Sequence, residues 1–309
     1  MKSPAILETF LALLDLERIE ANLFRGGYLD IGIPHVFGGH VLAQALMAAQ
    51  RTVVEERHAH SLHAYFLRPG DPKAPIVYDV DRIRDGRSFT TRRVVAIQHG
   101  RAIFNMSASF QVEESGPEHR IDPPEGVPAP HELPNEDELR RRLLDALPAG
   151  DRERLLAPRP IEIRPVDPEN PFSPKARPPL KYTWFRAAGT LPADATLHKA
   201  TLAYASDFGL LGASLLPHAL SFLQPNLQGA SLDHAMWFHR PCRADEWLLY
   251  RMTSPSMSNA RGFNRGEIFT HDGVLVASVA QEGLVRLHPP SPHDTSDSGR
   301  GTARSPIPE

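Results

Sequence analysis

Asp207 is a carboxylate in an otherwise apolar setting, within the sequence ATLAYASDFG at 200–209. Read as a helix, this region places apolar residues three and four positions apart, which is the pattern of a helix that buries one face. These residues are Leu197, Ala200, Thr201, Tyr204, Phe208, Leu211 and Leu215. A carboxylate beside an apolar face is unfavourable unless it is hydrogen-bonded or used in chemistry. Asp207 is therefore either a structural group, such as a cap near the helix end, or a general base.

The chain contains two copies of one sequence pattern. Four pairs of anchors occur in the same order in both halves, at separations of 172 to 174 residues. The pairs are Arg68 with Arg240, Tyr78 with Tyr250, Arg87 with Arg261, and the turn His99-Gly100 with Asp272-Gly273. Ordered anchors at a nearly constant separation predict two copies of one helix-and-sheet unit.

The two copies differ at three polar positions, which mark a candidate site in the second copy. Ser231 aligns with Ala59 and Gln281 with Ala108, while Asp207 has no acidic counterpart in the first helix. Asp can act as a general base, and Ser and Gln can orient a water molecule. This set suits attack of an activated water on an acyl carbon, with a backbone N–H stabilising the oxyanion. A thioester is a suitable substrate, because its thiolate leaves without strong protonation.

Rival chemistries are less well supported by the sequence. A serine nucleophile needs a base within hydrogen-bond reach, and strand alternation is expected to place His234 on the opposite face from Ser231. The sequence contains no GxSxG, Walker or GxGxxG motif. His58, His60 and His63 resemble a metal cluster, but alternation turns His63 away from the other two. We therefore expect neither a metal nor a cofactor.

The elements that must position these residues follow an α+β pattern. Residues 39–52 are apolar almost all round and predict a buried helix. A short helix to about Leu14 is expected before it, and residues 16–25 are expected to begin a strand. Strand-like runs lie at 61–67, 76–83, 88–98 and 101–111 in the first half, and at 161–164, 181–187, 231–238, 246–253, 262–270 and 274–286 in the second.

Changes in composition divide the chain into four segments. Residues 1–112 form the first copy, and residues 161–288 form the second copy with the candidate catalytic residues. Residues 113–160, rich in Pro, Glu and Arg, predict a linker with one exposed helix near 135–147. The tail 289–309 has almost no apolar residue and is expected to be disordered.

Overall composition is that of an ordinary globular protein, 41% hydrophobic and 23% charged. The net charge of −3 gives no basic excess for binding nucleic acid. Glu8, Asp15 and Glu17 interrupt the apolar N-terminal patch, so we expect neither a signal peptide nor a membrane span there. The single cysteine, Cys242, cannot form a disulfide within the chain, which fits a reducing compartment. We expect a cytoplasmic protein.

Seven strings resemble the acyl-CoA thioesterase II family. They keep order and spacing from about residue 16 to 287, interrupted only by the linker. The strings are PHVFGGHVLAQAL, HSLHAYFLRPGD, RDGRSFTTRRV, YASDFGLL, DHAMWFHRP, ARGFNRGEIFTHDGVLVAS and AQEGLVR. The resemblance implies a double hotdog, in which each of two tandem units wraps a curved antiparallel β-sheet around a central helix.

The resemblance also implies the catalytic residues. The family's active-site Asp follows YAS, its hydroxyl residue precedes a short run into DH, and its Gln precedes EG, which correspond to Asp207, Ser231 and Gln281. We expect hydrolysis of medium- to long-chain fatty acyl-CoA to free fatty acid and CoA, by Asp-activated water and without an acyl-enzyme. The sequence does not determine the preferred chain length, which depends on tunnel depth.

Two alternatives remain open. A hotdog enoyl-CoA hydratase or dehydratase would act on the same substrate class, but it needs an acid or His placed to add water across a double bond. A non-catalytic acyl-CoA-binding protein would need none of the three polar residues. Arg87, Arg261 and Arg265 are either contacts for CoA phosphates or solvated strand residues. Hotdog units usually pair sheet edges, and the resemblance suggests a homodimer or homotetramer.

Overall fold

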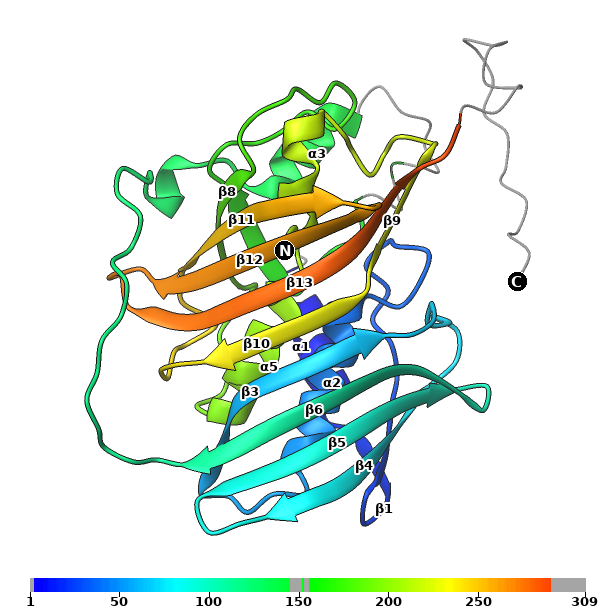
Figure 1. Ribbon diagram of the computed structural model, residues 1–309, viewed down its shortest axis with the longest axis vertical. Coiled ribbons are helices and arrows are strands. Elements are labelled where there is room, and N and C mark those ends of the chain that lie inside the picture. Colours follow the sequence, from blue (N-terminus) through cyan, green and yellow to red (C-terminus); the bar gives the residue numbers. More distant parts are fainter. Residues whose placement is uncertain (1–2, 145–151, 153–155, 290–309) are drawn as a thin grey trace.

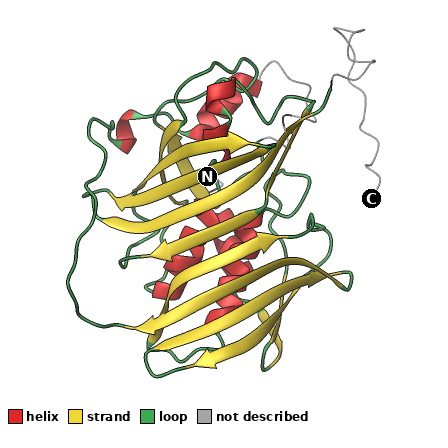
Figure 2. Ribbon diagram, viewed as in Figure 1, coloured by secondary structure: helices red, strands yellow, loops and turns green. Residues whose placement is uncertain are grey.

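The computed structural model describes residues 3–144, 152 and 156–289. The described strands join into one curved antiparallel sheet, and helices α1, α2 and α5 lie together on one face of it (Figure 1). Figure 2 shows the two layers, with the strands in front of the central helices. This is the α+β double hotdog that the sequence predicts.

The first half runs from α1 to β6. Its elements are α1 (Ser3–Leu14), β1 (Glu17–Glu20), β2 (Leu23–Gly26), α2 (Gly38–Gln50), β3 (Arg57–Phe66), β4 (Ile76–Asp85), β5 (Phe89–Gln98) and β6 (Arg101–Val112). Every residue of α2 from Gly39 to Ala49 is buried, because this helix is apolar nearly all round and packs against α5. The single strand expected at 16–25 is present as two short strands joined by a turn.

The second half runs from β7 to β13. Its elements are β7 (Ile161–Pro165), β8 (Leu180–Ala187), α5 (Ala195–Ser206), η2 (Leu211–Ser214), η3 (Leu216–His218), β9 (Leu227–Ser231), β10 (Asp233–Phe238), β11 (Leu248–Ser258), β12 (Arg261–Thr270) and β13 (Leu275–Leu287). The helix that precedes Asp207 is shorter than its apolar pattern predicts. It ends at Ser206, because Gly209 turns the chain with a φ of 75°.

The segment between the halves contains η1 (Pro130–Glu132) and α3 (Glu136–Leu144). The sequence predicts an exposed helix here, and α3 confirms the helix over the described residues. The prediction that this helix is exposed is wrong for the face that packs against β7, where Leu144 is buried. Residues 145–147 of the predicted helix lie outside the described residues, as does the predicted disordered tail after residue 289.

The two halves meet where β3 pairs with β10, in the order β1-β2-β4-β5-β6-β3-β10-β13-β12-β11-β8-β7. His63 lies opposite Ala235, and their separation, 235 − 63 = 172, equals that of the sequence anchors. On either side of this pair, Asp233 lies opposite Tyr65 and Trp237 lies opposite Ser61, and each pair is the other with the two units exchanged. The two units are therefore related by an approximate two-fold axis at this point. The junction leaves neither β3 nor β10 as an open edge.

Strand registers repeat between the halves. Ala64 lies opposite Met106, and their counterparts Met236 and Val279 lie opposite each other. The second separation is 279 − 106 = 173, which places Gln281 at the position of Ala108 (281 − 108 = 173). The pairing of Arg87 with Arg261 is wrong by two residues, because β5 begins at Phe89 and β12 at Arg261, a separation of 172. Similar Arg-x-Phe strings produced that error.

Among the described residues, no helix has the length and apolar character needed to cross a membrane. The cytoplasmic location stays a prediction.

Candidate active site

Asp207 lies directly after α5, as its C-terminal cap. The helix starts at a defined point, because the Asp194 side chain accepts hydrogen bonds from the N–H groups of Thr196 and Leu197. At the other end, the Asp207 side chain is only 6% exposed. A carboxylate with so little access to water needs hydrogen-bond donors around it.

The three residues predicted from the sequence come together in the structure. Gln281 Nε2 on β13 donates to Asp207 Oδ1 at 2.7 Å. The same nitrogen lies 3.2 Å from Ser231 Oγ at the end of β9. Ser231 pairs with Gly283, two residues beyond Gln281, so neighbouring strands hold both side chains at one point. Gln281 thus links the nearly buried carboxylate of Asp207 to the hydroxyl of Ser231.

The first unit supplies the other contact of Asp207. The N–H of Gly39, in the first turn of α2, donates to Asp207 Oδ2 at 2.8 Å. No side chain caps this helix at Phe37, so the carboxylate of the second unit serves as its cap. A helix N-terminus carries partial positive charge, which stabilises the ionised carboxylate. The candidate site therefore lies between the two units.

Two glycines make this approach possible. A Cβ at Gly38 would lie 2.8 Å from Asp207 Oδ2, and one at Gly39 would lie 2.4 Å from the backbone oxygen of Tyr204. Both distances are shorter than real Cβ contacts. The first turn of α2 can therefore reach α5 and Asp207 only without side chains at these positions.

His234 is part of the site, and its predicted position on the opposite face is wrong. It is fully buried, with Nε2 2.9 Å from Ser206 Oγ and Nδ1 3.2 Å from Gln281 Nε2. The alternation argument fails because β9 ends at Ser231 and β10 begins at Asp233, so one alternation does not span both. Burial lowers the pKa of His234, and the nearby Asp207 carboxylate opposes this shift.

The His234 network supports an orienting role. A neutral ring can donate from Nε2 to Ser206 Oγ, whose hydroxyl donates to the carbonyl of Ala203. Nδ1 then lies 3.2 Å from Gln281 Nε2, whose two hydrogens are shared among Asp207, Ser231 and this ring. Within the described residues, Ser231 Oγ has a hydrogen bond to Gln281 and none to a histidine, so the geometry does not build a serine nucleophile.

A buried acceptor remains beside the carboxylate. Gln281 Oε1 has no hydrogen-bond partner among the described residues, and neither has Oδ1 of its cross-strand neighbour Asn264. Buried polar atoms are rarely left without partners. Gln281 Oε1 is thus a buried acceptor on the same amide group that donates to Asp207.

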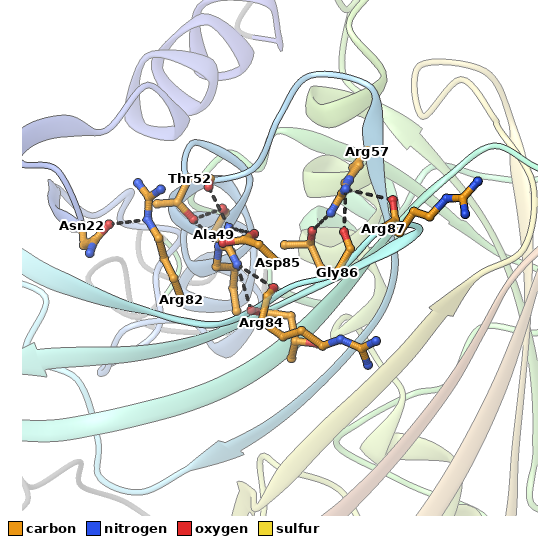
Figure 3. A network of polar contacts seen from close by, with 12 residues as sticks. Asn22, Ala49, Thr52, Arg57, Arg82, Arg84, Asp85, Gly86 and Arg87 are labelled. Carbon is orange, nitrogen blue, oxygen red and sulfur yellow. Dashed lines mark hydrogen bonds and ion pairs between the residues drawn. The ribbon is translucent and has the colours of Figure 1, made fainter.

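The first unit has a different residue pair at the place that Asn264 and Gln281 occupy in the second unit. Arg92 occupies the place of Asn264, since 264 − 92 = 172, and lies opposite Ala108 in the register. Its side chain is 1% exposed, donates to Thr52 Oγ1 at 2.8 Å and forms an ion pair with Asp85 at 2.6 Å. Figure 3 shows Thr52, Arg84 and Asp85 gathered in this network. A guanidinium therefore stands where the second unit has its polar pair.

Within the described part of the chain, no group of three His, Cys, Asp or Glu side chains could hold a metal ion. His60 lies 2.8 Å from Ser109 Oγ, and the His63 ring packs on Trp237 at 5.2 Å between centroids. Arg261 is one of the arginines that the sequence suggests as a contact for CoA phosphates. Its Nε donates to the Glu282 carboxylate at 2.9 Å, so its charge is already paired within the sheet.

Comparisons with known proteins identify the family. The acyl-CoA thioesterase model matches residues 151–284, and the model of the acyl-CoA thioesterase N-terminal domain matches residues 25–111. Acyl-CoA thioesterase 2 of Haemophilus influenzae is 42% identical over 282 residues, which cover 91% of this chain and 98% of that protein. The chain belongs to the acyl-CoA thioesterase II family. It is a thioester hydrolase.

Two further relatives of this acyl-CoA thioesterase support the same family assignment. Human acyl-coenzyme A thioesterase 8 is 42% identical over 285 residues, covering 89% of this chain and 88% of that protein. The crystal structure of an acyl-CoA thioesterase II from Mycobacterium marinum has 43% identity and a TM-score of 0.73, and the match covers 90% of this chain and 98% of that one. A hot dog protein from Alicyclobacillus acidocaldarius, at 18% identity and a TM-score of 0.70, supports the fold alone.

Proposed function

We propose that this acyl-CoA thioesterase hydrolyses medium- to long-chain fatty acyl-CoA with Asp207 as general base and with Ser231 and Gln281 orienting the attacking water. The observation that carries this proposal is the hydrogen bonding of one nearly buried carboxylate to both units. Gln281 holds Oδ1 at 2.7 Å and Gly39 holds Oδ2 at 2.8 Å. A carboxylate has about four acceptor sites, so both oxygens can still accept a hydrogen bond from water.

The reaction follows from these positions. Asp207 accepts a proton from the water as the water oxygen bonds to the thioester carbonyl carbon. The main-chain N–H of Gly38, at the start of α2, stabilises the oxyanion that forms, because the N–H groups of Gly39 and His40 already donate to Asp207 and to the Phe37 carbonyl. The C–S bond then breaks, and the CoA thiolate receives the proton held by Asp207. The products are a free fatty acid and CoA, and no step requires a metal, a cofactor or an acyl-enzyme.

The test is release of free thiol from a panel of acyl-CoA substrates, with Asp207→Asn as the decisive variant. Asn keeps the shape but cannot accept the proton, so kcat should fall by about 10²–10⁴. Asp81→Asn is the matched control, because Asp81 is half exposed on the outer face of the sheet. Undiminished hydrolysis by Asp207→Asn would reject the assignment of the base. A wild-type protein that hydrates an enoyl-CoA, or binds acyl-CoA without turnover, would support one of the alternatives.

Oligomerisation to a homodimer or homotetramer is part of the proposal. Tyr65 is 59% exposed and Trp237 is 37% exposed, at the junction of β3 with β10. Large aromatic side chains at such a position suit burial against another copy of the chain. Light scattering measures the mass directly, and a monomer at micromolar concentration would reject this part of the proposal.

A further inference from the structure

A cavity of about 700 Å³ lies at the C-terminal end of α5. Ala205, Phe208 and Gly209 line it, whereas Asp207, between them in the chain, directs its carboxylate to Gly39 and Gln281. The cavity therefore begins one residue from the proposed general base, on another side of the same chain segment. Its volume falls within the range of about 300–1,000 Å³ that is typical of ligand pockets.

The walls of this cavity combine the second unit with the linker. Ile161 and Ile163 of β7 face it, and so do Leu139 and Leu143 of α3. α3 lies between the two segments, 25–111 and 151–284, that match the family models. Most of the lining side chains are apolar, which suits a hydrocarbon chain. The charged side chains among them form ion pairs with one another, Arg140 and Arg159 with Glu136, and Arg177 and Lys181 with Glu169.

Phe208 lines the cavity and also contacts Phe37, the residue that precedes α2. Its ring stacks on Phe37 at 4.4 Å between centroids, and Phe37 immediately precedes the glycines that approach Asp207. The Arg159 guanidinium lies 5.2 Å from the centroid of the Phe208 ring, and Arg159 pairs with Glu136 of α3 at 2.8 Å. Gly209 follows Phe208 with a φ of 75°, a backbone conformation that favours glycine, so no side chain stands next to Phe208 on that side of the chain.

We propose that this cavity receives the acyl chain of the substrate, with Phe208 as its gate and the linker helix α3 as the wall that sets the acceptable chain length. This inference rests on the proposed function, because it needs the thioester carbonyl at Asp207. The acyl chain starts at that carbonyl, and displacement of the Phe208 ring opens the adjacent apolar space to it. The polar CoA part stays on the opposite side of the carbonyl.

The position of α3 predicts where chain length matters. Glu136, at the start of α3, lies near the gate through its pair with Arg159. Leu143 is seven residues further on, which is about 10 Å along a helix that rises 1.5 Å per residue. A short acyl chain ends before reaching Leu143, and a long chain passes it. Each methylene kept out of the cavity should lower kcat/KM by about fourfold.

Leu143→Trp tests this prediction, with Arg142→Trp as the matched control on the exposed side of the same helix. Thiol release is measured from butanoyl-CoA to hexadecanoyl-CoA. Leu143→Trp should retain wild-type kcat/KM for butanoyl-CoA and lose tenfold or more for hexadecanoyl-CoA, while Arg142→Trp changes neither. Equal chain-length profiles in Leu143→Trp and the control would overturn the cavity assignment and leave the proposed function intact. Failure of wild type to hydrolyse any acyl-CoA would overturn both.

A binding measurement tests the cavity without turnover and without a change in α3. Gly212 lines the cavity, and a Cβ there would meet only the flexible end of Lys181, at 3.3 Å, and no other heavy atom within 4 Å. Gly212→Leu therefore fills the space at little cost to the fold. Hexadecyl-CoA, an inert thioether, should raise the Tm of wild type and raise that of Gly212→Leu much less. Equal Tm shifts would overturn the inference.

Discussion

Replacing Gly39 by Ala tests whether the first unit positions the proposed base of the second. A Cβ at this position would lie 2.4 Å from the backbone oxygen of Tyr204 and 2.6 Å from the Phe37 ring. Real Cβ contacts do not fall below 3.0 Å, so α2 and α5 must separate by about 3.0 − 2.4 = 0.6 Å. The contacted oxygen belongs to the backbone of α5, and a helix backbone cannot move one atom alone. The shift therefore reaches Asp207, which caps the same helix.

The consequences of that shift can be estimated. Overpacking of a tight contact costs about 1–3 kcal/mol of unfolding free energy. The Gly39 N–H donates to an ionised carboxylate, and weakening such a bond adds about 1.5–3 kcal/mol if it is lost completely. Displacement of a catalytic group by 1 Å can lower the rate by about 10²-fold. We expect kcat/KM for a long-chain acyl-CoA to fall by about tenfold to 10²-fold, with a Tm lowered by several degrees.

The assay is thiol release together with thermal unfolding. Gly116→Ala is the matched control, because a Cβ there would meet no atom within 4 Å and should change neither quantity. Wild-type kcat/KM in a folded Gly39→Ala protein would refute the argument that this amide holds Asp207. A lowered Tm with unchanged kcat/KM would show that the contact is structural only.

Two further predictions concern buried charged and titratable groups. Burial lowers the pKa of His40 from 6.5 to about 4, so between these pH values the unfolded chain binds a proton that the folded chain does not. About 3 kcal/mol of unfolding free energy should therefore be lost as the pH falls from 6.5 to 4. Urea unfolding at several pH values measures this loss, which should be smaller in His40→Gln. Arg92→Met should lower the unfolding free energy by about 1–3 kcal/mol, because the buried hydroxyl and carbonyl of Thr52 lose their hydrogen-bond donor, while the Asp85 carboxylate left behind is exposed to water. Arg93→Met, at a half-exposed ion pair, should cost less than about 1 kcal/mol. Retained stability in Arg92→Met would contradict the importance of the network in Figure 3.

Comparison of the two copies is what made the site accessible from the sequence. Ser231 and Gln281 stand where the first copy has alanines, and the strand registers place Gln281 and Ala108 at equivalent positions. The comparison identifies these positions, and the structure shows that Gln281 joins Ser231 to Asp207. The double hotdog was predictable for the same reason, together with the family resemblance.

Other parts of the site depend on contacts that the sequence does not encode locally. The role of Gly39 requires knowing that α2 of one unit begins against the C-terminal end of α5 of the other. His234 was misplaced because a break at Leu232 separates two strands that read as one apolar run. The half-buried face of α3 was missed because its leucines stand among many charges, and only the packing on β7 reveals their use.

The capping of α2 by Asp207 makes the proposed catalytic centre a property of the tandem and not of either copy. A detached C-terminal copy would retain Asp207, Ser231 and Gln281 and would still lack the amide of Gly39. The covalent link keeps the two copies at a high effective concentration for each other, so the centre assembles in every molecule regardless of dilution. On this proposal the first copy contributes to the reaction without a polar set of its own, through the close approach of Gly38 and Gly39 to Asp207 and α5.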